Sequence, residues 1–477
     1  MTNKEYQEIC DYLRTLTVGS KWENHIYAVG GAVRDSVMGN PIKDIDIVLD
    51  LPNGGIEFSQ WLYENNYLIR KPITYPTYGT SMFVLTEFPS CEIEAVHTRK
   101  EQYKDKDSRN PKQEYGTIEE DAFRRDLTIN ALYYNITKKR IYDPTNSGIN
   151  DINEQIIRVT NPNPDIVFTE DPLRILRAIR FFTRYDGFRI CEKTFSSMKN
   201  NVDRLNIISK ERIADELNKM LLSNKPSKAI RMICEIGAMK YVIPEVDTLK
   251  TIKQNKYHFG NVYEHTMAVL DNLSTCDKLV VRMAGLLHDI GKINTFSEDE
   301  NGNVHFYKHE LESEKLCSII LKRLRYSNDF IDEVAFLCKN HMKTKNWGDD
   351  KSKIKDKTLR KLQYECKTLD RFMRLLALID ADNKSHAAEY CLHDNVNNII
   401  EKVKEMSVNN TTMFDYKLPV NGNDVMAIKG LKPGREIKKV LDYVLKLCFN
   451  NPLITKEECL KHVKGYKLLK NKEYEKF

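Results

Sequence analysis

Two glycines and two aspartates stand close together in the stretch VGGAVRDSVMGNPIKDIDIV, residues 29–48. Gly30 and Gly31 follow an apolar strand-like segment and open a short helical one, so their backbone can approach a phosphate chain at a helix start. Asp44 and Asp46 are two residues apart in a second strand-like segment and share one face. Carboxylates beside a phosphate-binding turn predict a divalent-metal site, with Mg²⁺ as the expected ion, for transfer of a nucleotidyl group. A hairpin with a solvated acidic face is the alternative for either half alone.

A third metal carboxylate is expected in CEIEAVHTR, residues 91–99. Glu94 lies on a strand-like segment and would join the two aspartates as a catalytic residue. Glu92 has the same parity along the strand, so the pattern does not separate the two, and we favour Glu94. A surface strand with acidic side chains is the alternative.

The block EDAFRRDLTINAL, residues 120–132, places two arginines and an aspartate before a short strand. Arg124 and Arg125 suit a triphosphate or a ribose, and Asp126 can accept from a sugar hydroxyl. Taken alone, the block favours a helix-end cluster of ion pairs.

The block EDPLRILRAIRF, residues 170–181, opens a helix with Asp171 and Arg174 three residues apart on one face, and Arg177 follows on the same side. A carboxylate accepts from an exocyclic amino group, and a guanidinium donates to a ring acceptor. Cytosine and adenine present that pair of groups, whereas uracil and guanine do not. The pair therefore predicts selection of CTP and ATP; an ordinary intrahelical ion pair is the alternative. Further along, Arg212 is four residues before Glu216, which favours another such pair, supporting the base pocket.

Histidine and aspartate residues recur in the apolar helical part of the chain, in NVYEHTMAVL, AGLLHDIGK and LLALIDAD. A charged pair inside an apolar helix is costly unless a metal or a partner compensates it. Histidine and carboxylate together suit a transition metal. The expected metal ligands are His265, His288, Asp289 and Asp380. His309 and His341 are candidates for a second metal, Lys292 is a candidate phosphate contact, and unrelated helical histidines are the alternative.

The elements that position these residues differ between the two parts of the chain. Strands are expected at 26–29, 45–49, 81–85, 91–96, 131–135 and 140–143. Helices are expected at about 3–18, 31–38, 56–65, 119–125 and 150–156, and the charged segment 100–116 is expected to be a loop. From Asp171 onward, apolar residues recur at three and four, which predicts helices and no strand. Segments 294–304 and 343–357 are expected to be loops.

The composition is that of a multidomain globular chain. The 477 residues are 41% hydrophobic and 30% charged, and the net charge of +6 favours polyanions only mildly. Eleven scattered cysteines without a CxxC pair indicate reduced thiols, hence a cytoplasmic location, and not a disulfide scaffold or a Cys-ligated zinc. Neither a signal peptide nor a membrane span is expected, and no protein partner is predicted.

Together these blocks resemble the class II, bacterial-type tRNA nucleotidyltransferases (CCA-adding enzymes) and the related bacterial poly(A) polymerases. GGAVRD with DID resembles the catalytic motif of this family, RRDLTINAL its ribose-recognition motif and EDPLR its base-selecting motif, over residues 24–222. The histidine-aspartate set resembles the HD phosphohydrolase domain of some members, and residues 418–441 resemble the segment that often follows it. RFFTRYDGFRI departs from the usual small-residue ending of its motif.

The resemblance implies an α+β, polymerase-β-like head followed by an all-α neck, an HD-type body and a tail. The expected boundaries are 1–150 for the head, 151–225 for the neck, 226–390 for the HD domain and 391–477 for the tail. It implies addition of C, C and A to tRNA from CTP and ATP, with Mg²⁺ on Asp44 and Asp46. The implied nucleotide-binding residues are Gly30, Gly31, Arg34, Asp35, Arg124, Arg125, Asp126, Asp171, Arg174 and Arg177.

Several functions remain open at this point. A poly(A) polymerase shares every catalytic block, and an enzyme that adds only CC or only A would differ in the 100–116 segment. From another class, the head would be inactive and the protein would be an HD phosphohydrolase or an RNA-binding protein. The HD part implies hydrolysis of phosphoesters, such as 2′,3′-cyclic phosphates on damaged tRNA ends, with a second divalent transition metal.

Overall fold

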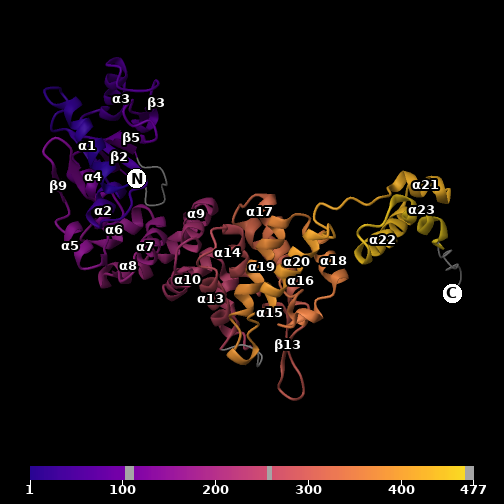
Figure 1. The fold of residues 1–477 in the computed structure, drawn as a ribbon. Helices are drawn as coiled ribbons and strands as arrows, with labels where there is room; N and C mark the ends of the chain where they lie inside the picture. The colour runs from indigo at the N-terminus through magenta and orange to yellow at the C-terminus, as the bar shows by residue number, and fades with distance from the viewer. Residues whose placement is uncertain (103–111, 255–259, 468–477) are drawn as a thin grey trace. The chain divides into compact units, whose positions relative to one another are not determined.

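The computed structural model describes residues 1–102, 112–254 and 260–467. The chain divides into two compact units: Met1–Asp247 with Arg323–Arg325, and Thr248–Lys322 with Tyr326–Phe477. Figure 1 shows that the first unit contains the main sheet and the second is mostly helical. In the described ranges, no helix combines the length and the apolar character that a bilayer span requires.

A seven-stranded mixed sheet forms the centre of the head, in the order β3-β4-β5-β2-β1-β8-β9. The strands are β1 (Ile26–Val29), β2 (Ile45–Leu49), β3 (Ile73–Tyr75), β4 (Thr80–Val84), β5 (Glu92–His97), β8 (Tyr133–Asn135) and β9 (Arg140–Tyr142). Only the β2–β5 pair among them is parallel. Buried Ile45 and Ile47 alternate with Asp46 along β2, so one face of the strand enters the core and the other carries the carboxylate.

Helices of the head pack around the sheet (Figure 1). They are α1 (Asn3–Thr17), α2 (Gly31–Val37), α3 (Gly54–Glu64), α4 (Ile118–Phe123) and α5 (Gly148–Asn153). The α3 helix packs very closely on β5 at Gly55. A Cβ at this position would lie only 2.5 Å from the carbonyl oxygen of Ala95. A capping box at Thr2 starts α1.

The sequence predicts the main head elements with boundaries that differ by up to three residues, but it misses three strands. The exposed strand β3 is one of them. The other two, β6 (Arg99–Gln102) and β7 (Lys112–Tyr115), pair antiparallel where we expected a loop over 100–116. Their polar residues carry no apolar alternation, so periodicity could not show them. The middle of that predicted loop lies outside the described residues.

Helices continue after the head. They are α6 (Pro164–Glu170), α7 (Leu173–Arg184), α8 (Glu192–Asn200), α9 (Lys210–Leu221), α10 (Pro226–Glu235), α11 (Met239–Val242) and α12 (Pro244–Thr248). The α7 helix packs on α9 and α10. The expectation of no strand in the helical part is wrong, since β11 (Arg189–Ile190) pairs parallel with β10 (Ile156–Ile157).

The second unit has helices around the predicted HD residues: α13 (Val262–Asn272), α14 (Leu279–Leu287), α15 (Lys292–Thr295), α16 (His309–Arg323), α17 (Asn328–Asn340), α18 (Asp356–Cys366), α19 (Leu369–Asn383) and α20 (Asn395–Val408). It also contains a hairpin, β12 (Phe296–Glu298) with β13 (Val304–Phe306), in a segment that we predicted as a loop. Short 3₁₀ turns, Lys345–Trp347 and Lys351–Lys353, interrupt the other predicted loop.

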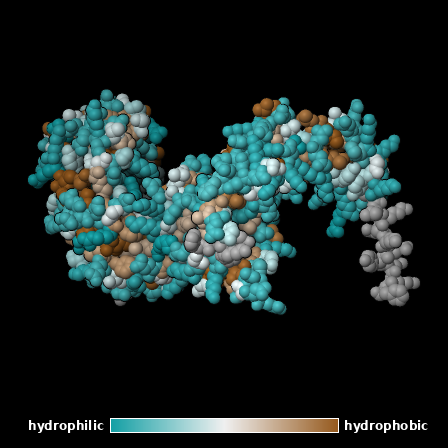
Figure 2. Space-filling view, turned by 60° about the horizontal axis from the view of Figure 1, so that its bottom comes forward, coloured by the Kyte–Doolittle hydropathy of each residue, from teal (hydrophilic) through white to brown (hydrophobic). Residues whose placement is uncertain are grey.

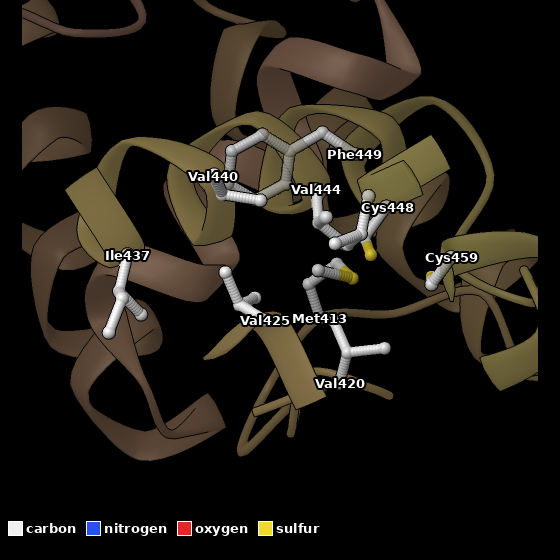
Figure 3. Close-up of a cluster of buried hydrophobic side chains, with 10 residues drawn as sticks. Met413, Val420, Val425, Ile437, Val440, Val444, Cys448, Phe449 and Cys459 are labelled. Atoms are coloured by element: carbon white, nitrogen blue, oxygen red, sulfur yellow. The ribbon is translucent and has the colours of Figure 1, made fainter. Parts of the chain in front are cut away.

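The last helices, α21 (Gly422–Lys429), α22 (Arg435–Asn450) and α23 (Lys456–Gly465), surround an apolar cluster of their own. Figure 3 shows side chains of α22, among them Val440 and Val444, gathered over Val425 and Met413. This burial holds short helices that would be marginal alone. Hydrophilic side chains cover most of the face seen in Figure 2.

Candidate nucleotidyltransfer and metal sites

A cavity of about 1000 Å³ lies in the first unit, between the sheet and helices α7 and α9. It receives the turn after β1, the facing side chains of β2 and β5, and the segment after α4. Thirteen of the predicted residues of the head and neck line it: Gly30, Gly31, Arg34, Asp35, Asp44, Asp46, Glu94, Arg124, Arg125, Asp126, Asp171, Arg174 and Arg177. The fold thus brings to one place residues that are up to 147 positions apart in the chain.

The carboxylates meet because of the strand register. Asp46 is the direct partner of Glu94 in the parallel β2–β5 pair and of Val29, immediately before the glycine turn, in the β1–β2 pair. Burial, and then the proximity of Glu94, raise the pKa of Asp46 to about 6. Asp44 precedes the strand with a 72% exposed side chain. Glu92 contacts Arg70 at 3.6 Å, whereas Glu94 lines the cavity.

The turn between β1 and α2 has a backbone conformation that favours glycine. Gly30 has φ +66°, which an L side chain rarely adopts, and directly precedes α2. Arg34 on α2 is buried, and its guanidinium contacts Asp35 at 2.8 Å and donates to the side-chain oxygen of Asn130 at 2.5 Å. Tyr185 also donates to Asp35, at 2.9 Å. Neighbouring groups therefore hold Arg34 in place at the wall of the cavity.

Asp121 holds both arginines of the RRD block, a role that the sequence analysis missed. Arg124 contacts one carboxylate oxygen of Asp121 at 2.6 Å, Arg125 contacts the other at 3.0 Å, and the Tyr133 hydroxyl donates to the same carboxylate. Burial alone would raise the pKa of Asp121, but the two arginines outweigh it and hold this pKa well below its usual range. Asp121 therefore fixes two cations beside the metal carboxylates.

Arginines of α7 recur at three and four residues, so they line one face of the helix and the cavity. Arg177 contacts Asp126 at 2.6 Å, and Arg180 contacts buried Glu216 at 2.6 Å. Burial would raise the pKa of Asp126, but Arg177 lowers it to about 2. Arg174 donates to the Val167 carbonyl and to Glu170.

The partner of Asp171 comes from another helix. Arg212 on α9 contacts the Asp171 carboxylate at 2.8 Å, while the backbone N–H of Leu173 donates to its other oxygen at 3.1 Å. The intrahelical pair expected between Arg212 and Glu216 is therefore wrong, since Glu216 engages α7.

The second unit contains a separate cavity of about 460 Å³, with two groups of metal-ligand type at its base. The first group is His265, His288 and Asp382, and the second is Asp289, His309 and His341. Asp289 faces both groups: one oxygen lies 3.3 Å from His288 and the other 3.2 Å from His309. Burial lowers the pKa of His341 to about 4, so this imidazole is neutral at pH 7.

The histidine tautomers fit a metal. The Nδ1 atoms of His265, His288, His309 and His341 all lie within hydrogen-bond distance of backbone carbonyls. A carbonyl only accepts, so Nδ1 carries the proton, and in the neutral imidazole Nε2 keeps its lone pair. The Nε2 atoms of His265 and His288 face each other at 3.3 Å, as do those of His309 and His341. Opposed lone pairs of this kind suit a cation placed between them.

The prediction of Asp380 as a ligand is wrong. Asp380 contacts Lys384 at 2.6 Å, whereas Asp382 lies 3.1 Å from Nε2 of His265. A helix turns through about 200° in two residues, so the two aspartates point in opposite directions. The signal that identifies Asp382 is its place on the buried stripe of Leu375 and Ile379, at the i, i+4, i+7 spacing.

Two lysines lie beside the acidic ligands. The Lys292 ammonium is 2.7 Å from Asp289, and the Lys345 ammonium is 2.9 Å from Asp382. Lys345 also lies 2.9 Å from Nε2 of His386, at the cavity wall. These ammonium groups balance charge at carboxylates that are almost fully buried.

Three family models match successive parts of the chain. A model described as the poly A polymerase head domain matches residues 26–158, one described as a probable RNA and SrmB-binding site of polymerase A matches 187–250, and the HD domain model matches 256–382. The multifunctional CCA protein of Methylobacillus flagellatus is 30% identical over 75% of this chain and 83% of its own length.

The chain belongs to the family of CCA-adding tRNA nucleotidyltransferases and bacterial poly(A) polymerases. The tRNA nucleotidyltransferase cca1 of Schizosaccharomyces pombe is 28% identical over 91% of this chain and 90% of its own. The crystal structure of the Bacillus stearothermophilus CCA-adding enzyme in complex with CTP has a TM-score of 0.68, with 20% identity over 97% of this chain and 96% of that one. The predicted fold class, a polymerase-type α+β head followed by a helical neck and an HD body, is confirmed.

Proposed function

We propose that this protein adds C, C and A to the 3′ end of tRNA, using CTP and ATP without a nucleic-acid template. The observation that carries the proposal is the register of Asp46 with Glu94 beside the glycine turn, in a cavity walled by arginines. Family membership supports it, as does the likeness to the Thermotoga maritima CCA-adding enzyme, which has been solved in complex with tRNA. We further propose that the enzyme works in the cytoplasm.

Asp44, Asp46 and Glu94 are the residues that would hold Mg²⁺, since oxygen ligands suit this ion. Asp46 fits a cation, because burial beside Glu94 raises its pKa to about 6 and a bound cation would offset that cost of ionisation. The ion, when bound, lowers the pKa of the attacking 3′-hydroxyl and stabilises the leaving pyrophosphate. Gly30 and Gly31 let the backbone meet the triphosphate, and Arg34 and Arg125 compensate its charge.

The sugar and the base meet the other side of the cavity. Asp126, held by Arg177, can accept from a ribose hydroxyl. Asp171 accepts the exocyclic amino group of cytosine or adenine, and Arg174 faces the ring acceptor. The tRNA is held through its backbone by lysines and arginines, which makes binding sensitive to salt.

Purified protein incubated with CTP, ATP and a tRNA that lacks its last three nucleotides tests the proposal. We expect a product three nucleotides longer, with C, C and A in that order. A long ladder of A would instead identify a poly(A) polymerase, and a product shorter by one or two nucleotides would identify partial specificity. An enzyme that adds only A would leave this tRNA unextended but would extend a tRNA that already ends in CC, so no extension of either tRNA would mean that the head is inactive.

A second function is favoured by the two groups of ligands that share Asp289. We propose that the HD domain hydrolyses phosphoesters, including 2′,3′-cyclic phosphates at damaged tRNA ends, with a divalent transition metal. His265, His288 and Asp382 would hold one ion, and Asp289, His309 and His341 a second. Such ions supply an activated water at neutral pH. Hydrolysis of a nucleoside 2′,3′-cyclic phosphate to its monoester, and release of phosphate from that monoester, each measured with Ni²⁺, Mn²⁺ or Zn²⁺ added, test it.

A further inference from the structure

Arg212 and Asp171 form a contact in the head cavity that joins a proposed base-reading residue to helix α9. They are 41 residues apart in sequence, and the guanidinium Nη2 lies 2.8 Å from Oδ2 of Asp171. The N–H of Leu173 donates to Oδ1 of the same carboxylate at 3.1 Å. Both oxygens are therefore held, one by the backbone of α7 and the other by a side chain of α9.

This contact differs from two other arginine pairs of the cavity. Arg177–Asp126 and Arg180–Glu216 each use a carboxylate that is at most 5% exposed. The Asp171 side chain is 24% exposed and that of Arg212 is 47% exposed. Each carboxylate oxygen can accept two hydrogen bonds, so Asp171 keeps room for a further donor.

We propose that Arg212 is a specificity-determining positioning residue, which fixes the Asp171 carboxylate so that it accepts the amino group of cytosine or adenine and repels the carbonyl oxygen of uracil or guanine. The proposal rests on the proposed function and adds a residue to it. A carboxylate held at both oxygens cannot turn away from a carbonyl oxygen that faces it. A carboxylate held only by the N–H of Leu173 can turn about its Cβ–Cγ bond, and water can then bridge it to the wrong base.

Arg212 affects the discrimination between bases more than the affinity for a nucleotide. Removal of Arg212 leaves Asp171 in place, so an amino-bearing base still finds an acceptor, though a less ordered one. The repulsion of a carbonyl-bearing base falls because the carboxylate can rotate. The loss of one charge-assisted contact corresponds to about a tenfold change in the ratio between bases.

Arg212→Met keeps an unbranched side chain close to the length of the arginine stem and removes its donors, whereas Arg212→Lys keeps a cation. The control is Lys225→Ala, which removes a cation of similar exposure from its ion pair with the more exposed Asp186, outside the cavity. kcat and KM are measured separately for CTP, ATP, UTP and GTP, on tRNAs that end one position before each addition. All variants are used as full chains.

We expect Arg212→Met to raise KM for CTP and ATP with a smaller change in kcat, and to lower the CTP-to-UTP and ATP-to-GTP ratios of kcat/KM about tenfold. Arg212→Lys recovers part of the selectivity, and Lys225→Ala matches the parent protein. An equal loss with all four nucleotides, or unchanged ratios in Arg212→Met, would overturn the proposal. A parent protein that extends no tRNA would instead overturn the proposed function, so the two failures are distinct.

Discussion

The two cavities balance buried charge in different ways. In the head, buried carboxylates are paired with the arginines of the protein itself, as Asp121 is with Arg124 and Arg125. In the HD cavity, Asp289 and Asp382 lie against lysine ammonium groups and against the Nε2 atoms of histidines. The head is built to present a fixed cationic wall to a triphosphate that comes and goes. The HD cavity is built to hold cations themselves.

The proposed metal ligands of the two cavities also differ in exposure. Asp44 is largely exposed, whereas each of the six proposed HD ligands is at most 6% exposed. An ion held by the proposed ligands of the head would therefore exchange with each nucleotide, whereas an ion held by those of the HD cavity would have a buried and pre-oriented set of ligands. Each cavity therefore has its own expected response to the loss of one carboxylate.

The largest expected effect breaks the head alone. Asp46→Ala removes a proposed Mg²⁺ ligand and should lower the rate of nucleotide addition by about 10³-fold or more, because the charge on the leaving group is no longer stabilised. Binding of tRNA and phosphoester hydrolysis should stay within about twofold of the parent protein. A variant that still extends tRNA at the parent rate would show that this carboxylate is not a metal ligand.

The next prediction tests how much the Asp121 carboxylate stabilises the head through its contacts with Arg124 and Arg125. Asp121→Asn should destabilise the head by about 3–5 kcal/mol, since two buried arginines lose their partner. The folded pKa of Asp121 lies below its unfolded value of about 3.9, so its contribution is present above about pH 4 and is lost as the pH falls below that value. Hydrogen exchange of head peptides across a urea series measures the change. Asp215→Asn, at an exposed pair with Lys219, is the control and should cost about 0–1 kcal/mol.

A matched pair of variants tests which of two aspartates in α19 binds the proposed metal of the HD domain. Asp382→Asn should weaken metal binding by more than about 100-fold, because even the loss of an outer-shell partner costs roughly 10- to 100-fold. Asp380→Asn, two residues away and paired with Lys384, should leave it unchanged. Titration of the metal-stripped full chain with Mn²⁺ or Zn²⁺ measures both. Equal losses in the two variants would contradict the assignment.

The smallest effect separates two glutamates of β5. Glu94→Gln should lower nucleotide addition about tenfold or more, since one acceptor for the metal is weakened. Glu92→Gln removes an exposed contact with Arg70 and should change the rate less than about twofold. Steady-state addition of a single C compares them. A larger loss in Glu92→Gln would reverse the choice between the two residues.

The sequence predicted the cavity well because its residues lie in contiguous blocks, each with its own spacing. Asp46 and its strand followed from alternation with Ile45 and Ile47. Asp121 was not singled out because it is one of three acids in the first turn of a short helix, where acids are common, although Arg124 and Arg125 follow it at the i+3 and i+4 spacing that a sequence shows.

Residues that depend on tertiary contacts were the ones predicted least well. Arg212 was assigned to its neighbour on the same helix, because i,i+4 spacing is visible in a sequence and a contact between distant segments is not. The expectation that Asp380, and not Asp382, would be a metal ligand failed for another reason. The period of Leu375 and Ile379 selects Asp382, so in this case the pattern itself contains the answer.

The close approach of α3 to β5 has a consequence for the reaction. A methyl group added at Gly55 would press on the backbone of Ala95, the residue that follows Glu94 in the strand. Since packed interiors transmit displacement, the strand would shift and carry the glutamate out of step with Asp46. A side chain at position 55, on the face of the sheet opposite the cavity, would thus change the separation between Asp46 and Glu94 without touching either residue.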